Sequence, residues 1–373
     1  MLVYVVLYIW FIALYAVTLF NESRIYNKNG SVRGPEYYRK RYVIFTFGAI
    51  ILMLGLRAEF MGEDLLKGLN PGYLPTFEDI AAHPWSDVLG GKTWYNYERG
   101  YTIFNKVVGI FSTNHQVFLF ICALISVAPI AYVIYKHSYN LFLSVIVFMG
   151  LPTFVVEFST LRQAIAMSIT FLALHFVIEH KPWIFVILIL LASTFHGSAI
   201  LCLLCYPVFY YRNTRKSIIV NIFILAAIFV LRKPLYYAFC MIAYGSVTTD
   251  DAGAINLLIF FVAIYLFCAL FMDIDNKMSN GFLNLFWFSC VFQIISNVFM
   301  EVTRQGYYFN LALIILLPEV FKDMKRSTKP WVRYLSMTLL VLFFIAFGYF
   351  ELATTEWSVS NPYYFFFNAP KIH

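Results

Sequence analysis

The sequence predicts an all-α polytopic membrane protein with about 12 transmembrane helices. Of its 373 residues, 61% are hydrophobic and only 13% are charged, whereas a soluble domain of this size needs more charge to cover its surface. Aromatic residues make up 20%, which suits helices that face lipid and end in interfacial belts. The formal net charge of +7 is therefore interpreted through its distribution over two membrane faces, and not as a sign of an acidic partner.

Twelve apolar stretches approach the ~20 residues that a helix needs to span a bilayer. They begin near residues 2, 42, 115, 140, 161, 183, 197, 217, 255, 282, 305 and 333. The first has no charged n-region and no cleavage site, so we expect a transmembrane helix and not a signal peptide. The sixth and seventh are short and meet at Phe195-His196-Gly197, where we expect a tight hairpin or a broken helix. No linker or internal repeat divides the chain, so residues 1–373 are predicted to form a single integral membrane domain.

Lys and Arg set the expected orientation, because cytoplasmic loops carry an excess of both. The first loop, residues 21–41, holds six of them, so it is expected in the cytoplasm and the N-terminus outside. Alternation from there places most of the 27 Lys and Arg inside and most of the 20 Asp and Glu outside. Residues 57–114 then form a large extracytoplasmic loop between the second and third helices, and residues 101–111 an amphipathic helix in the interface.

The sequence offers only weak metal and redox signals. Cys202-x-x-Cys205 has a suitable spacing, but no second pair or nearby His completes it, so helix packing is the favoured interpretation. Asp273-x-Asp275 resembles the Asp-x-Asp of nucleotide-sugar transferases, but a short inner loop surrounds it. Glycine-rich phosphate loops and nucleic-acid motifs are missing from the sequence. We therefore expect no metal, no other cofactor and no nucleic-acid partner.

Charged residues beside membrane helices are costly, so each is a candidate for function. Arg57 ends the second apolar stretch, and Glu59, Glu63 and Asp64 follow it. The guanidinium could bind an anion and a carboxylate could act as a base, or the acids could pair with a helix end that reaches water. Glu98, in Tyr97-Glu98-Arg99-Gly100-Tyr101, could be a base, could hold an arginine, or could belong to an ordinary polar loop.

Two more arginines lie at predicted helix ends. Arg162-Gln163 open an apolar helix, where an Arg adds its charge to the positive end of the helix dipole and favours anions. The alternative is an ion pair between Arg162 and Glu157. Arg304 follows Glu301 by three residues, so the two could pair on one helix, although Arg304 also lies where an outer cavity is expected.

His196 lies between two short apolar segments. Its imidazole could transfer a proton near neutral pH, or could be packed against a free carbonyl at a helix break. Arg232-Lys233 begin another outer segment, with Asp250-Asp251 at its far end. Membrane-edge anchors are the favoured interpretation of that segment, over binding of a polyanion.

Several arginines on one side indicate a phosphate or pyrophosphate ligand, because the guanidinium fork matches phosphate oxygens and stays charged. Tyrosines near these arginines suit the faces of sugars: Tyr97, Tyr101, Tyr307 and Tyr308. An outer cavity rich in Arg and aromatic residues therefore fits a lipid-linked sugar pyrophosphate.

The chain resembles the EpsG-type branch of the Wzy-like polysaccharide polymerases over most of its length. The motifs that carry the resemblance are Gly55-Leu56-Arg57 with Gly62-Glu63-Asp64, Glu98 before Gly100-Tyr101, Leu161-Arg162-Gln163-Ala164-Ile165-Ala166, Phe195-His196-Gly197-Ser198-Ala199, Arg304 with Tyr307-Tyr308-Phe309, and Asn361-Pro362-Tyr363. The family pattern after Gly-x-Asp runs into one or two spaced tyrosines, where this chain has Leu65, Leu66, Lys67 and Gly68. That departure alters the expected surroundings of Asp64.

The resemblance implies a metal-independent membrane glycosyltransferase of Wzy type. Such an enzyme acts at the outer face of the bacterial cytoplasmic membrane and joins repeat units carried on undecaprenyl pyrophosphate. The product would be an O-antigen, capsule or exopolysaccharide. The expected partners are the lipid-linked donor and acceptor, membrane lipid and a chain-length regulator.

The resemblance and the residues together suggest roles for the site. Four residues are predicted to bind the pyrophosphates: Arg57, Arg162, Gln163 and Arg304. His196 is the first candidate for the base that activates the acceptor hydroxyl, with Glu98 and Asp64 behind it. Alternatives remain open: a flippase of lipid-linked oligosaccharide, a glycosyltransferase that adds a single sugar, and an envelope acyltransferase. A flippase should show polar residues through the full depth of several helices, whereas here the predicted helix centres are mostly apolar.

Overall fold

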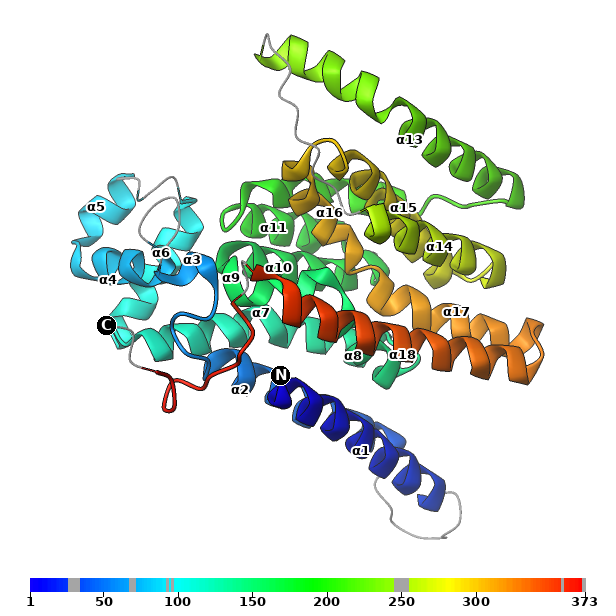
Figure 1. Cartoon of the computed structure of the whole chain (residues 1–373), viewed down its shortest axis with the longest axis horizontal. Coiled ribbons are helices and arrows are strands. Elements are labelled where there is room, and N and C mark those ends of the chain that lie inside the picture. Colours follow the sequence, from blue (N-terminus) through cyan, green and yellow to red (C-terminus); the bar gives the residue numbers. More distant parts are fainter. Residues whose placement is uncertain are drawn as a thin grey trace. The chain divides into compact units, whose positions relative to one another are not determined.

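The computed structural model describes residues 1–25, 34–66, 72–91, 94, 97–244, 255–356 and 359–370. All named elements in these ranges are helices (Figure 1), so the predicted all-α class is confirmed. The chain forms two compact units, Met1–Ile200 with Leu340–His373, and Leu201–Leu339. The single membrane domain over residues 1–373 stays a prediction.

Six of the described helices are long and apolar enough to cross a membrane. They are α1 (Leu2–Ile25), α7 (His115–His137), α10 (Leu161–Ile178), α13 (Arg215–Tyr244), α15 (Lys277–Ser296) and α18 (Pro330–Thr354). A seventh span results if α8 (Leu141–Gly150) and the segment Pro152–Ser159, made of η1 (Pro152–Phe154) and α9 (Val156–Ser159), count as one helix bent by 72°. A multi-pass membrane protein is therefore supported.

The predicted count of twelve spans is not confirmed. Three of the predicted stretches form helices of 10–17 residues, below the ~20 that a span needs. These are α11 (Pro182–Ser193), the segment Gly197–Phe209 made of η2 (Gly197–Leu204) and α12 (Cys205–Phe209), and α14 (Ile255–Phe271). Hydropathy alone counts these stretches as spans because their residues are apolar. A helix this short can also be buried inside a membrane protein.

Asparagine side chains begin several helices by accepting hydrogen bonds from N–H groups of the first turn, which have no partner inside the helix. Asn114 accepts from Gln116 and Val117 at the start of α7. Asn140 does the same at α8, and Asn276 at α15. These caps fix where the apolar helices start.

In the first unit, α7 packs against both α2 (Pro35–Gly55) and α10, and α10 also packs against α11. Of the apolar window of α10, 78% is buried, against 11% for α13 in the second unit. The helix α10, which begins with Leu161 and Arg162, therefore lies in the interior of its unit, whereas α13 exposes an apolar surface suited to lipid.

The long loop 57–114 contains four helices where the sequence predicted one. They are α3 (Glu63–Leu66), α4 (Tyr73–Ala82), α5 (Trp85–Gly90) and α6 (Arg99–Phe111). The expected amphipathic helix corresponds to α6, which buries Tyr101, Asn105 and Val108 and packs against α4 and α5. Its opposite side exposes Phe111 and Ile110. A place in the membrane interface stays a prediction.

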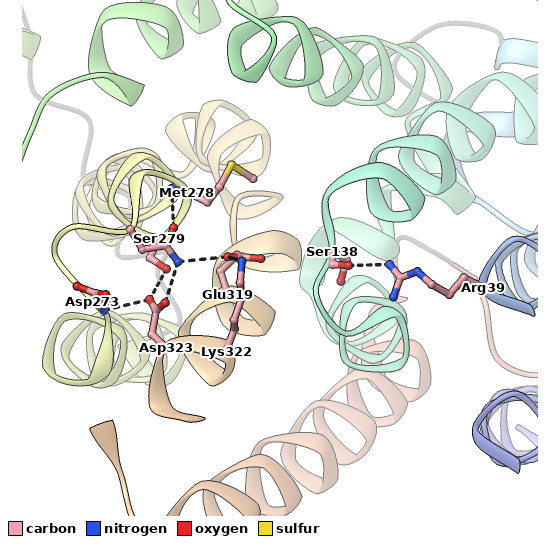
Figure 2. A network of polar contacts seen from close by, with 9 residues as sticks. Arg39, Ser138, Asp273, Met278, Ser279, Glu319, Lys322 and Asp323 are labelled. Atoms are coloured by element: carbon pink, nitrogen blue, oxygen red, sulfur yellow. Dashed lines mark hydrogen bonds and ion pairs between the residues drawn. The ribbon is translucent and has the colours of Figure 1, made fainter. Parts of the chain in front are cut away.

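In the second unit, α15 contacts α12, α13, α14, α16 (Thr303–Asn310) and α17 (Leu313–Ser327). Figure 2 shows a polar network in this unit around Asp323 of α17, which accepts hydrogen bonds from the Asp273 N–H at 3.0 Å and the Ser279 hydroxyl at 2.5 Å. The Asp273 carboxylate accepts a hydrogen bond from the Asp275 N–H at 3.0 Å. Asp273-x-Asp275 therefore shapes the turn between α14 and α15.

Candidate functional site

The carboxylate of Glu98 joins three segments of the first unit. Glu98 directly precedes α6, Arg162 is the second residue of α10, and His196 lies in the turn between α11 and η2. Nη1 of Arg162 donates to Oε2 of Glu98, and the Gly197 N–H donates to Oε1 at 2.9 Å. Nδ1 of His196 lies 3.7 Å from the same Oε1. Three motifs far apart in the sequence thus converge on one carboxylate.

The sequence left open two partners for Arg162 and three roles for Glu98. The structure pairs Arg162 with Glu98 and not with Glu157, which is buried on α9. Both oxygens of the Glu98 carboxylate are engaged, one by Arg162 and one by Gly197. The geometry therefore favours Glu98 as the residue that holds an arginine.

A glycine allows this convergence. A Cβ atom at Gly100 would lie 2.1 Å from Oγ1 and 2.8 Å from the carbonyl oxygen of Thr194, which is too close for any side chain. The N–H of the next residue, Tyr101, donates to the same Thr194 carbonyl at 3.3 Å. The start of α6 is thus in direct contact with the end of α11, and this contact places Glu98 beside His196.

Two tyrosines, Tyr73 and Tyr97, contact the guanidinium of Arg162, and a third packs against both of them. The central carbon of the guanidinium lies 4.3 Å from the ring centroid of Tyr97 and 5.9 Å from that of Tyr73, within the range of cation–π attraction. Nε of Arg162 donates to the Tyr73 hydroxyl at 3.4 Å. Tyr101 packs edge-on against both other rings. Burial raises the pKa of Tyr97 above its ordinary value, so this phenol stays neutral.

The cluster is partly open to a ligand. The side chains of Arg162, Glu98 and His196 are 20%, 25% and 17% exposed. The Nη2 group of Arg162 takes part in neither the Glu98 contact nor the Tyr73 contact. A fixed guanidinium with remaining N–H donors, a carboxylate and an imidazole can therefore meet a bound anion and a hydroxyl group together.

Asp64 lies in the short helix α3. Its backbone N–H donates to the Ser159 hydroxyl at 3.2 Å. Two residues earlier, Gly62 has a φ of 124°, and a Cβ atom there would lie 2.1 Å from the Phe158 carbonyl oxygen. Glycine is thus required where α3 meets α9. The negative charge of Asp64 adds to burial in raising the pKa of Tyr97. Of the residues where the chain departs from the family pattern, Lys67 and Gly68 lie outside the described ranges.

Arg57 has partners of a different kind. Its side chain is 1% exposed and donates to three backbone carbonyls, those of Leu54, Met61 and Phe158, the last two at 3.2 Å. Burial lowers the pKa of Arg57 to about 10, so it remains charged at neutral pH. In this structure Arg57 holds the end of α2 against α9, and a role as a pyrophosphate ligand stays a prediction.

The C-terminal motif contacts the backbone around Arg57. Tyr363 donates from its hydroxyl to the Met53 carbonyl at 2.6 Å, and the backbone of Phe365 forms an antiparallel bridge with that of Arg57. The Ala58 N–H donates to the Tyr364 carbonyl at 3.0 Å. The motif Asn361-Pro362-Tyr363 and the residues after it are therefore held by hydrogen bonds against the backbone around Arg57.

The remaining predicted residues lie elsewhere. Gln163 is 2% exposed and follows Arg162 by one helix position, so its side chain points about 100° away from it. Arg304 is exposed on α16 of the second unit, where Tyr308 is buried and Tyr307 partly buried. Convergence of Arg304 with Arg162 stays a prediction, because the two belong to different units.

Two contributors were not foreseen as site residues. Tyr73 was visible only as one of many aromatic residues in the loop. The Gly197 N–H was invisible, because every residue except proline carries one. The signal that could have found it was the glycine directly after His196, at a helix break where N–H groups lack partners inside a helix.

The apolar helices and the charged cluster at their ends define a multi-pass membrane protein with a polar site built by its loops and helix starts. The family model described as the EpsG family matches residues 40–365. The chain therefore belongs to the EpsG family, and EpsG-like proteins are Wzy-type polymerases. Membership indicates a membrane polysaccharide polymerase with a glycosyltransferase-like reaction. No curated protein and no solved structure matches the chain.

Proposed function

We propose that this protein joins oligosaccharide repeat units carried on undecaprenyl pyrophosphate, at the outer face of the bacterial cytoplasmic membrane. The family supports the reaction class. We place the site at Glu98, because Arg162, His196 and the Gly197 N–H converge on its carboxylate.

The reaction needs one bond to form and one to break. The hydroxyl oxygen of the acceptor unit attacks the anomeric carbon of the donor chain. The bond from that carbon to the pyrophosphate oxygen breaks, and the lipid pyrophosphate leaves with the electron pair. Stabilising this charge and aligning two large substrates are the main tasks of the protein.

Arg162 stabilises the leaving pyrophosphate in this proposal. The contacts with Glu98, Tyr73 and Tyr97 fix its guanidinium before substrate arrives. A donor fixed in this way needs little reorganisation in the transition state. Arg57, Gln163 and Arg304 remain candidates for further contacts with the two pyrophosphates.

His196 takes the proton of the acceptor hydroxyl. Its Nδ1 faces the Glu98 carboxylate at 3.7 Å, so Nε2 is the nitrogen that acts as the base. The carboxylate orients the ring and stabilises the imidazolium that forms, as in other carboxylate–histidine pairs. Asp64 is the second candidate for the base, and Tyr97, Tyr101, Tyr307 and Tyr308 are candidates for contacts with sugar faces.

A deletion strain tests the proposal. The proposal predicts single repeat units on the lipid carrier that reach the outer face and stay unpolymerised, with long chains restored by the wild-type protein. Single units that stay on the inner face would contradict a polymerase and indicate a flippase. The lipid-linked glycans are measured by mass spectrometry after labelling of the outer face.

A further inference from the structure

The second unit contains an apolar cavity beside α13, a candidate span of which only 11% of the apolar window is buried. The cavity has a volume of about 520 Å³ and lies between α13, α14 and α15. Its lining includes Leu225 and Phe229 of α13, Leu258 and Val262 of α14, and Ile294 of α15, all of them hydrocarbon side chains. Such a volume is typical of sites for small organic ligands, which take ~300–1,000 Å³.

A second cavity of about 280 Å³ continues along the same face of α13. Its lining includes Arg232 and Tyr236 of α13 and Ile295 of α15. The positions 222, 225, 229, 232 and 236 line one cavity or the other and follow one another at helical spacing. This stripe is about 21 Å long at the rise of an α-helix. The two cavities therefore lie along one face of α13, and together they are called the α13 groove.

Arg232 is the one charged residue among those that line the α13 groove. Its Nη1 donates to the Phe229 carbonyl of its own helix, and its guanidinium lies 3.9 Å from the Phe229 ring centroid. Its Nε is buried without a hydrogen-bond partner. Among the described residues, none of the ion pairs involves Arg232. A charged residue at a membrane helix is a candidate for function, and an arginine without an acidic partner is a candidate to bind an anion.

We propose that the α13 groove holds the polyprenyl chain of the lipid-linked substrate, and that Arg232 binds its phosphate. This inference rests on the proposed function. An apolar groove with one cation among the residues that line its smaller cavity matches an amphiphile with a single long chain, whereas a glycerophospholipid brings two chains. Val302 lines the cavity of Arg232, and Arg304 follows two residues later, so a second arginine belongs to the same part of the unit.

The two parts of the groove have different tasks. Bilayer lipid is as apolar as the groove, so packing of the chain gains little over packing in the membrane. The hydrocarbon contacts therefore orient the chain, and the charged contact with Arg232 provides most of the affinity. Loss of one charge-assisted contact weakens binding by about 10- to 100-fold.

Photolabelling tests this assignment on the full chain. The probe is a benzophenone analogue of a polyprenyl phosphate, in nanodiscs of palmitoyl-oleoyl phosphatidylethanolamine and phosphatidylglycerol. We expect labelled peptides from the groove face of α13 and from α14. Arg232→Gln is expected to weaken labelling by about 10- to 100-fold, and Ala263→Trp, which fills the larger cavity, to remove it. Val230→Trp, at a residue of α13 that is 71% exposed, is the matched control and should leave labelling unchanged.

Labels outside the α13 groove in the wild-type protein would overturn the proposal, whatever the folding of the variants. So would equal labelling by a benzophenone phosphatidylglycerol, or undiminished labelling of a folded Arg232→Gln variant. The two proposals fail separately. Groove labelling without joining of repeat units would sink the proposed function alone, and joining of units without groove labelling would sink this inference alone.

Discussion

The Arg162→Lys substitution separates charge from geometry at the site, because lysine keeps the charge and loses the planar fork. Arg162 donates to Glu98 and, at 3.4 Å, to Tyr73, while its guanidinium lies 4.3 Å from the Tyr97 ring centroid. A single ammonium group cannot keep these contacts and also present two N–H donors to a pyrophosphate. We therefore expect polymer formation to fall steeply.

The magnitude follows from the lost contacts. Removing one fixed donor to a developing negative charge costs ~100- to 1,000-fold in rate. The Tyr73 contact adds less, because a neutral hydrogen bond contributes ~1 kcal/mol even with good geometry. The expected rate for Arg162→Lys is thus at least ~100-fold below that of the wild type.

The assay measures release of undecaprenyl pyrophosphate from lipid-linked repeat units by detergent-solubilised protein at equal concentration. Arg99→Lys is the matched control, since Arg99 directly follows Glu98, is exposed, and donates to the Leu89 carbonyl at 3.3 Å. This control should keep the wild-type rate. A rate for Arg162→Lys within about threefold of the wild type, less than ~0.7 kcal/mol, would refute the reasoning.

Three further substitutions test the supporting contacts. Arg57→Met leaves three buried carbonyls without their donor, so the thermal unfolding midpoint in detergent should fall by roughly 10 °C, and an unchanged midpoint would contradict its structural role. Gly100→Ala should lower the polymerisation rate about tenfold or more because the new Cβ meets Thr194. The control Gly90→Ala, whose Cβ would have no atom within 4 Å, should retain full activity. Tyr73→Phe should lower the rate by about fivefold or less, and a loss above about 100-fold would mean that this hydroxyl contacts substrate.

Hydropathy was enough to predict the all-α membrane class, because apolar runs of 17 to 25 residues are visible without knowledge of tertiary contacts. It was not enough to count the spans. The stretch at 183 forms α11, which has 12 residues, and the stretch at 140 bends by 72°. Length in the folded state depends on where a helix breaks, and apolar residues on either side of a break look continuous in the sequence.

The members of the charged cluster were predicted singly, but their partners were not. Glu98 was expected to act as a base, to hold an arginine or to belong to an ordinary polar loop, and the structure pairs it with Arg162. Nothing in the sequence relates Glu98 to Arg162, since 64 residues separate the two charges. The resemblance to the family identified the motifs, but it did not show which of them lie in contact.

For Arg57, the sequence did not indicate the kind of partner that the structure shows. Its place at the end of an apolar stretch predicted an anion ligand or an ion pair. The structure gives it backbone carbonyls instead. Carbonyl groups occur at every residue, so a sequence cannot reveal that they satisfy a buried charge.

The most direct test of the account is reconstitution of the purified protein with one lipid-linked repeat unit in proteoliposomes. The account predicts lipid-linked chains of two and more units, with one undecaprenyl pyrophosphate released for each bond formed, and formation of both products at least ~100-fold more slowly by Arg162→Lys. Intact single units after prolonged incubation with folded wild-type protein, or their transfer across the bilayer without joining, would contradict it.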